Sequence, residues 1–357
     1  MPLEKQIPHR EVHAVRNDIA SEAIGGFVPF VAAVYTASRT VITVRSATLH
    51  DIPAIVAIHR SDLVTWKRWD ADDNVHLSDY ANLTPYERWL NGGWWMDPGL
   101  YRPYLERLLR PDGAGMALVA ELDGQVLAEA EAWLGTEPPP YGRNLNLSVI
   151  YTLRGNARRG LGTALMQALE ARAAAEACDT MLVTMVEAPD FYRRFGFAPA
   201  ETWRRARMPA KTANTQYTAA PDPLGSYDAV RGWAMPVGRY QSSRQQWERA
   251  QPGLEPDFEA WRDLRHGAWR LEVRREPAVL LLEEVPRERG VADVHLWTHT
   301  PSLSRQLVQA IRDRGAQMGF AELHFLVTEA GLAQLGGDWR DDGYKQPVWM
   351  KQLRAAA

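Results

Sequence analysis

Cysteine is nearly missing from the 357-residue sequence, and its scarcity excludes two kinds of architecture. Cys178 is the single cysteine, so the chain has neither an intrachain disulfide framework nor a cysteine-rich metal site. The histidines offer no substitute, because His50, His59 and His76 show no spacing typical of metal ligands. We therefore predict no bound metal, and we expect a protein of the reducing cytoplasm.

Net charge and long apolar runs are also scarce. The 41 lysines and arginines nearly balance 44 aspartates and glutamates, and without a global basic field we expect neither a nucleic-acid nor a membrane partner. The candidate targeting segment, residues 24–35, is too short for a membrane helix, which needs roughly twenty residues. Acidic residues precede this segment and Pro29 interrupts it, so it is a poor signal peptide. We expect residues 1–40 to form a poorly ordered extension.

What the sequence does contain, in its first half, is the pattern of a crossover unit. Asp123-Gly124 joins two β-like runs and predicts a tight hairpin. Further along, the pattern predicts a strand at 145–152, a glycine-rich loop, a helix at 160–177 and a strand at 181–186. Strand, loop, helix and strand in this order form a crossover connection.

The second half repeats this order after a polar stretch at 208–223, which is typical of a linker. The length of the chain also exceeds what one core usually organises, so we predict domains at 41–207 and 224–357. "LGTALMQALEARAAAEACDTMLVTMVEA" aligns with "LSRQLVQAIRDRGAQMGFAELHFLVTEA", so that Leu165 meets Leu307. This similarity predicts an internal duplication. For residues 339–353 we expect a helical turn and a closing strand.

The stretch "NARRGLGTAL", residues 156–165, has the features of a phosphate-binding loop. Gly160 and Gly162 lack a Cβ atom and let the backbone N–H groups approach a bulky ligand. The helix that follows adds unpaired N–H donors and a positive dipole end. Arg158 and Arg159 add two full charges, so we predict a pyrophosphate site. The alternative is a simple strand-to-helix turn with solvated arginines.

Two familiar phosphate loops do not fit. A P-loop requires a lysine directly after its last glycine, but no lysine follows Gly162. A dinucleotide fingerprint requires a third glycine at the position where this chain has Leu165. Instead, "VIYTLRGNARRGLGTALMQAL" with the later "APDFYRRFGF" resembles the GNAT acetyltransferase superfamily. Its loop reads Gln/Arg-x-x-Gly-x-Gly/Ala, and its later element commonly reads Phe/Leu-Tyr-x-x-x-Gly-Phe. The later motif is complete from Phe191 to Phe197, whereas Ala157 departs from the usual Gln or Arg.

The resemblance implies an α+β (mixed α/β) fold of two GNAT-like units. Each unit would have a mostly antiparallel twisted sheet, flanking helices and a splayed central strand pair. It also implies that acetyl-CoA binds the first unit at Tyr151, Thr152, Leu153, Ala157, Arg158, Arg159, Gly160, Leu161, Gly162 and Thr163. In the second unit, Ser302 and Ser304 replace the loop glycines and both arginines are absent, so we predict one cofactor per chain.

Acyl transfer to an amine needs a proton donor for the sulfur and a base for the nitrogen. Tyr192 stands where many members carry the donor, and the alternative is a tyrosine that only packs on the sheet. Glu131 is the candidate base. Glu129 shares its face of a strand and Glu187 follows the next strand, so both remain alternatives, and each of the three also fits a solvated surface carboxylate.

The aromatic segment at 62–111 stands where the family builds its acceptor wall, and Asp70, Asp72, Asp73 and Asp79 would give it an acidic rim. It also fits a helix packed by tryptophans. We predict an acetyl-CoA-dependent N-acetyltransferase that acts by direct attack on a small-molecule or peptide amine. The alternatives are a non-catalytic acyl-CoA sensor and a thiol-biosynthesis acyltransferase. The second unit would serve as a scaffold, a homodimer surface or an acceptor wall.

Overall fold

The computed structural model describes residues 32–35, 41–70, 74–111, 114–251, 254 and 256–354. The predicted extension, residues 1–40, therefore lies outside the described residues except for β1 (Ala32–Tyr35), which pairs antiparallel with β2 (Val41–Ser46). None of the helices in these ranges combines the length and the apolar character needed to cross a bilayer.

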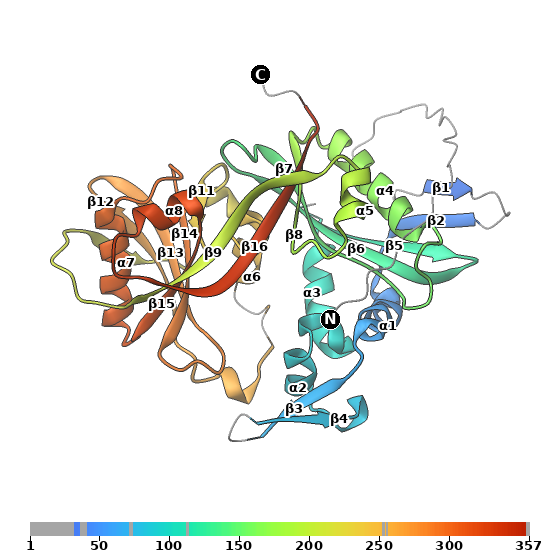
Figure 1. Ribbon diagram of the computed structural model, residues 1–357, viewed down its shortest axis with the longest axis horizontal. Coiled ribbons are helices and arrows are strands. Elements are labelled where there is room, and N and C mark those ends of the chain that lie inside the picture. Colours follow the sequence, from blue (N-terminus) through green and yellow to red (C-terminus); the bar gives the residue numbers. More distant parts are fainter. Residues whose placement is uncertain are drawn as a thin grey trace.

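The first unit is a twisted sheet with helices on both faces (Figure 1). Its strands after β2 are β5 (Gly115–Leu122), β6 (Gln125–Thr136), β7 (Arg143–Thr152) and β8 (Thr180–Thr184). Its helices are α1 (Ile52–Asp62), α2 (Pro85–Leu90), α3 (Pro98–Leu108), α4 (Leu161–Ala175) and α5 (Pro189–Arg194). A separate hairpin of β3 (Trp66–Trp69) and β4 (Val75–Ser78) follows α1.

Successive side chains of β6 point to opposite faces of the sheet, and different helices cover the two faces. Ala128, Ala130 and Ala132 lie in one core with α4, whereas Trp133 lies in another with α1 and α3. The predicted hairpin is confirmed between β5 and β6, where Asp123 has φ 53° and Gly124 has φ 80°. The predicted helix at 160–177 corresponds to α4.

The second unit repeats the layout. Its strands are β10 (Thr218–Pro221), β11 (Ala234–Val237), β12 (His266–Val273), β13 (Glu276–Glu284), β14 (Val291–Thr298) and β15 (Glu322–Thr328). Its helices are α6 (Ser243–Arg249), α7 (Arg305–Gln317) and α8 (Glu329–Gln334). Part of the stretch predicted as a linker is therefore β10, which pairs with β12.

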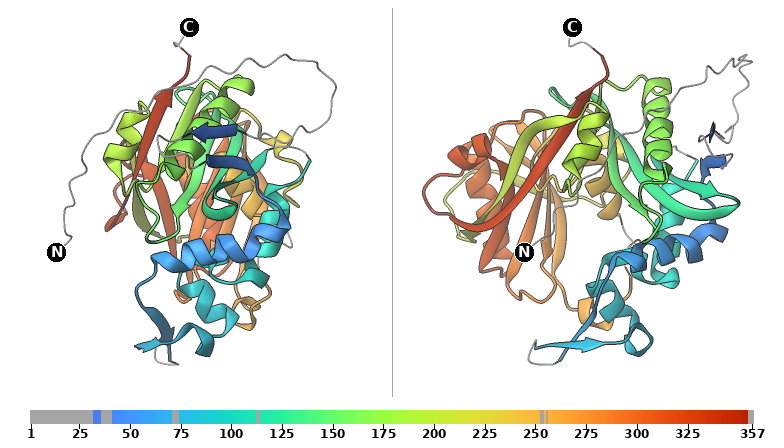
Figure 2. Two further views of the ribbon diagram at one scale, coloured as in Figure 1. Left: turned by 90° about the vertical axis from the view of Figure 1, so that its right-hand side faces the viewer. Right: turned by 45° about the vertical axis from the view of Figure 1, so that its right-hand side comes forward.

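The two units exchange their closing strands. β9 (Ala198–Pro209) follows α5 of the first unit but pairs with β15 of the second, and β16 (Arg340–Gln352) follows α8 but pairs with β8 of the first. β9 and β16 also pair with each other, and the views show them running together from one unit to the other (Figures 1 and 2). Fourteen strands of the described chain thus form one continuous sheet.

For residues 339–353 the predicted closing strand is confirmed, but the predicted helical turn is wrong. The segment is one strand of 13 residues, with β8 on one edge and β9 on the other. A helical turn would remove its backbone groups from both ladders, and those groups would lose their partners. The expected mixed α/β fold of two mostly antiparallel units is confirmed.

Both units contain the expected splayed strand pair. The parallel pairing of β7 with β8 ends at Leu147 and Val183, although β7 continues to Thr152. In the second unit, β14 pairs with β15 only as far as Asp293 and His324, although β14 continues to Thr298. Beyond these points the strands of each pair no longer share a ladder.

Candidate active site

The predicted phosphate loop connects the splayed end of β7 to α4. Gly160 is the residue before the helix and has φ 91°, a conformation that favours glycine. A Cβ atom there would lie 3.2 Å from Cδ1 of Ile42, whereas at Gly162 it would lie 3.5 Å from the Phe191 ring. Gly160 is therefore required by the backbone, and Gly162 leaves the helix entrance open.

The entrance of α4 has unused donors. Within the described residues, the backbone N–H groups of 158–163 donate to no protein acceptor, and the first bond of the helix runs from Ala164 N–H to Gly160 O. Arg158 and Arg159 are exposed beside them. Arg159 Nη1 donates a hydrogen bond to Asn156 Oδ1 at 2.8 Å. These groups form a cradle for an anion.

The remaining predicted cofactor residues lie around this cradle. Tyr151, Thr152 and Leu153 are half-buried at the end of β7, and Leu153 N–H donates to Leu127 O, towards β6. The other edge of this segment no longer pairs with β8 and is open to an extended ligand. The side chains of Leu161 and Thr163 differ: Leu161 is buried in the core, while Thr163 is half-buried. Ala157 is exposed in the loop.

Tyr192 is nearly buried on α5. Its ring packs edge-on against Phe191 and Phe197. Burial, with the charges of Glu187 and Tyr151, raises the pKa of Tyr192 to about 12, so the phenol stays protonated. Its hydroxyl forms no hydrogen bond with a described residue, which leaves its proton available.

Glu131 lies fully buried on β6, so the interpretation as a surface carboxylate is wrong for this residue. Its Oε1 accepts hydrogen bonds from Trp95 Nε1 at 2.7 Å and from the Tyr101 hydroxyl at 2.8 Å. Its Oε2 has no partner in the described chain. Burial, and then the neighbouring Glu129 charge, raise the pKa of Glu131 to about 8.

The other two candidate bases lie in different surroundings. Glu129 is fully buried beside Glu131, whereas Glu187 is exposed after β8. Glu129 Oε1 lies 2.5 Å from His59 Nε2, a partner that the sequence did not reveal. His59 is four residues after Ile55 on the apolar face of α1, and that position was the available signal.

His59 fills the space between three aromatic and acidic neighbours. Its ring stacks on Trp95 at 5.2 Å between centroids and lies 4.7 Å from the Tyr151 ring. Burial lowers the pKa of His59 to about 4 and raises that of Glu129 to about 8. Both groups are therefore neutral at pH 7, with the proton on the Glu129 carboxyl.

The aromatic segment divides into separate parts. Trp95, Tyr101 and Tyr104 pack beneath Glu131, and Trp89 instead packs edge-on against Trp261 of the second half. Of the aspartates predicted to form an acidic rim, the structure describes Asp70 and Asp79. Asp70 belongs to the β3–β4 hairpin, which projects from the end of the molecule away from α4 (Figure 1), and Asp72 and Asp73 lie outside the described residues.

The second half covers the sheet of the first unit. Gln245 of α6 accepts a hydrogen bond from Ser148 Oγ of β7 at 2.9 Å, and Gln241 Nε2 donates to the Ser148 carbonyl. Glu248 of α6 pairs with Arg107 of α3. The face that holds Glu131 is thus walled by residues of the second half.

The second unit does not present the same slot. β11 lies beside the splayed end of β14, with Ala234 opposite Thr298 and Val237 opposite Leu296. Gly238 N–H then donates to Leu326 O of β15 at 2.8 Å, so this segment bridges the two splayed strands. Ser304 caps α7 by accepting from Leu307 N–H. Protein groups therefore occupy both the slot and part of the helix entrance.

Comparisons with known proteins agree with this geometry. Residues 78–197 match the model of the acetyltransferase (GNAT) family. No curated protein matches the sequence. A GCN5-related N-acetyltransferase structure from Anabaena variabilis ATCC 29413 has 11% identity and a TM-score of 0.55, covering 88% of this chain and 73% of that one.

A second GCN5-related N-acetyltransferase, from Kribbella flavida, has 13% identity and a TM-score of 0.55, covering 89% of this chain and 73% of that chain. At these identities the likeness concerns the fold. The family match over residues 78–197 and this likeness of fold are both consistent with a member of the GNAT superfamily.

Proposed function

We propose that the first unit transfers an acetyl group from acetyl-CoA to a primary amine of a small molecule or peptide, by direct attack in a ternary complex. The observation that carries this proposal is the set of unused N–H donors at 158–163, beside the open edge of β7. The donors suit a pyrophosphate, and the open edge suits an extended pantetheine arm. Bound acetyl-CoA would supply the activated acyl carbon.

In this reaction, one residue of the chain would donate a proton and another would accept one. Tyr192 holds a phenolic proton that can pass to the departing sulfur as the carbon–sulfur bond breaks. Glu131 has an unpartnered Oε2 that can accept the proton released by the amine as the carbon–nitrogen bond forms. Because its pKa is raised to about 8, Glu131 is an effective base only when it is deprotonated above that pH.

Substitution of Gly162 tests this proposal. Gly162→Asp places a negative charge in the cradle at a position with room for a Cβ atom, and we expect it to abolish coenzyme A binding and turnover. Gly162→Ala, which adds a methyl group without charge, is the matched control and should retain binding. Equal coenzyme A affinity in wild type and Gly162→Asp would remove the pyrophosphate site and the proposed activity with it.

A non-catalytic acyl-CoA sensor is the second candidate, and the complete burial of Glu131 favours it. Both functions need the cradle, so coenzyme A binding does not separate them. Release of free thiol from acetyl-CoA over a panel of amines does. Thiol release that depends on an added amine identifies the enzyme, and binding without release identifies the sensor.

A further inference from the structure

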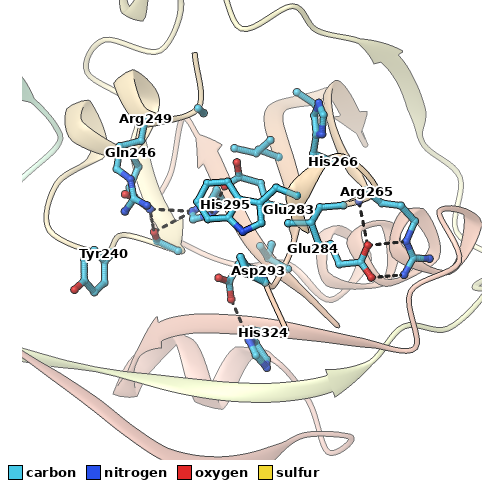
Figure 3. Close-up of a pocket in the computed structure, with 18 of the residues that line it drawn as sticks. Tyr240, Gln246, Arg249, Arg265, His266, Glu283, Glu284, Asp293, His295 and His324 are labelled. Carbon is cyan, nitrogen blue, oxygen red and sulfur yellow. Dashed lines mark hydrogen bonds and ion pairs between the residues drawn. The ribbon is translucent and has the colours of Figure 1, made fainter. Parts of the chain in front are cut away.

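A large cavity lies on the second unit, outside the site described above. It has a volume of about 980 Å³ and is lined partly by β13, β14 and α6 (Figure 3). Ala292, Val294 and Leu296 of β14 pack in the core with α7, so Asp293 and His295 face the opposite side, into the cavity. The cavity thus lies on the face of the sheet away from α7.

Two carboxylates line its floor. Glu283 of β13 lies directly opposite Asp293 of β14, and their side chains expose 36% and 46% of their surface. Glu283 Oε2 contacts His295 Nε2 at 3.1 Å, and Asp293 Oδ1 contacts His324 Nδ1 at 3.0 Å. The second oxygen of each carboxylate has no partner among the described residues. Two acceptor positions are therefore available to a ligand.

The charge on Glu283 is maintained at neutral pH. Burial opposes its ionisation, but the hydrogen bond and charge of His295, together with the charge of Arg249, outweigh burial and lower the pKa of Glu283. Glu283 is therefore a carboxylate at neutral pH and pairs with His295, whose own pKa is raised because the hydrogen bond and charge of Glu283 outweigh burial.

Helix α6 forms another wall of the cavity and contributes one cationic and one polar side chain. Arg249 lines the cavity, and no described residue forms an ion pair or hydrogen bond with its guanidinium. Gln246, on the same face of α6, is 6% exposed, and its Oε1 is buried without a partner. Its Nε2 is engaged with Gly238 O at 3.3 Å and His295 Nδ1 at 3.2 Å. The wall therefore offers one cationic donor and one buried acceptor.

We propose that this cavity binds a zwitterionic amino acid, whose carboxylate pairs with Arg249 and whose α-ammonium donates to Glu283, Asp293 and Gln246. A simple polycation would leave Arg249 unneutralised, and an anion would meet the two carboxylates. Within the described part of the chain, no group of His, Cys, Asp and Glu side chains has the geometry of a metal site. A ligand with both charges can pair with Arg249 and donate to the free oxygens of Glu283, Asp293 and Gln246.

The cavity also adjoins the first unit, and this relation rests on the function proposed above. Met185, directly after β8, lines it, and the Tyr240 hydroxyl contacts Met185 Sδ at 2.8 Å. Trp89 of the first unit lines the cavity as well. An amino acid held at Arg249 would direct a side-chain amine towards the first unit. The acceptor class is therefore an amino acid with a side-chain amine.

Calorimetric titration of the full chain at pH 7 with three probes tests the assignment. L-lysine has both α-groups, cadaverine lacks the carboxylate, and 6-aminohexanoate lacks the α-ammonium. We expect L-lysine to bind about tenfold or more tightly than either analogue, because each lost group removes a charge-assisted contact. Cadaverine binding as tightly as L-lysine would overturn the proposal, and so would an absence of L-lysine binding.

Arg249→Met should abolish the difference between L-lysine and cadaverine. Arg262→Met is the matched control, because Arg262 lines the same cavity but pairs with Asp257 and is 61% exposed. An unchanged preference for L-lysine in Arg249→Met would contradict the assignment. Gly162→Asp separates the two proposals: it should leave L-lysine binding intact while coenzyme A binding is lost, so either can fail alone.

Discussion

His59 Nε2 and Glu129 Oε1 lie 2.5 Å apart, and this contact joins α1 to the centre of β6. Both groups are buried, and the shifts in their pKa values leave both neutral at pH 7. The Glu129 carboxyl therefore acts as a hydrogen-bond donor to His59 rather than as an anion. A buried proton beside Glu131 makes the stability of the first unit depend on pH.

Glu129→Gln is expected to reduce this pH dependence. The pKa of Glu129 is about 8 in the folded protein against 4.5 for an ordinary glutamate, so stability present below 4.5 is lost as pH rises towards 8. The amide can still donate to His59 without ionising. Urea unfolding should show the variant gaining about 1–4 kcal/mol over wild type between pH 5 and 8.

The matched control is Glu106→Gln, because Glu106 is half-exposed on α3 and forms a surface ion pair with Arg102. Its unfolding free energy should stay within about 0.5 kcal/mol of wild type across the same range. Parallel pH profiles for wild type and Glu129→Gln would show that Glu129 is not protonated in the native state.

Glu131→Gln should lower kcat by about 100-fold, because the amide cannot accept a proton. The wild-type kcat/KM should rise as pH approaches about 8, where Glu131 ionises, and the variant should lose this rise. Initial rates of thiol release between pH 6 and 9.5 measure both effects. Glu187→Gln, at an exposed position, should behave as wild type. If Glu131→Gln turns over normally at all pH values, the base is another group.

Tyr192→Phe should lower kcat by about 10- to 100-fold and leave coenzyme A affinity unchanged. The ring would keep its contacts with Phe191 and Phe197, so the thermal midpoint should hardly move. Single-turnover rates and calorimetric affinity separate the two roles of this residue. Normal turnover in the variant would support the alternative in which Tyr192 only packs on the sheet.

One coenzyme A should bind per chain. The cradle at 158–163 has unused donors, whereas β11 lies across the corresponding slot of the second unit and Ser304 engages its helix entrance. Calorimetric titration of the full chain should therefore give a stoichiometry near one. Two equivalent sites would mean that the segment after β11 leaves the slot.

Val348→Asp should destabilise both units together. Val348 is fully buried on β16, opposite Thr184 of β8 and Glu201 of β9, so a charge there disturbs both ladders. We expect a loss of about 3 kcal/mol or more and one shared calorimetric transition. Val64→Asp is the control, since Val64 is 80% exposed. Two transitions, only one of them lowered, would show that the units unfold independently.

Local signals in the sequence predicted the parts of the structure that depend on neighbouring residues. Asp123-Gly124 adopts the turn expected of it, and Gly160 has the positive φ that a sharp entry into α4 requires. The shared face of Glu129 and Glu131 also followed from alternation along one strand, although their burial did not. These features need only the residues within a few positions of each other.

The features that escaped prediction depend on distant pairing. His59 meets Glu129 across 70 positions, and no local pattern specifies that contact. The pairing of β16 with β8 also escaped, because a strand carries no mark of which unit will bind its edge. The same holds for β11, whose short apolar sequence did not reveal that it would lie against β14.

The exchange of β9 and β16 also has a consequence for biosynthesis. A ribosome releases β8 long before β16, so the edge of β8 stays unprotected while the second half is being made. The nascent amino-terminal half therefore cannot complete its sheet while the rest of the chain is still being synthesised. Its completion is delayed until the carboxyl-terminal half has emerged, and during this interval chaperones would have an edge to bind.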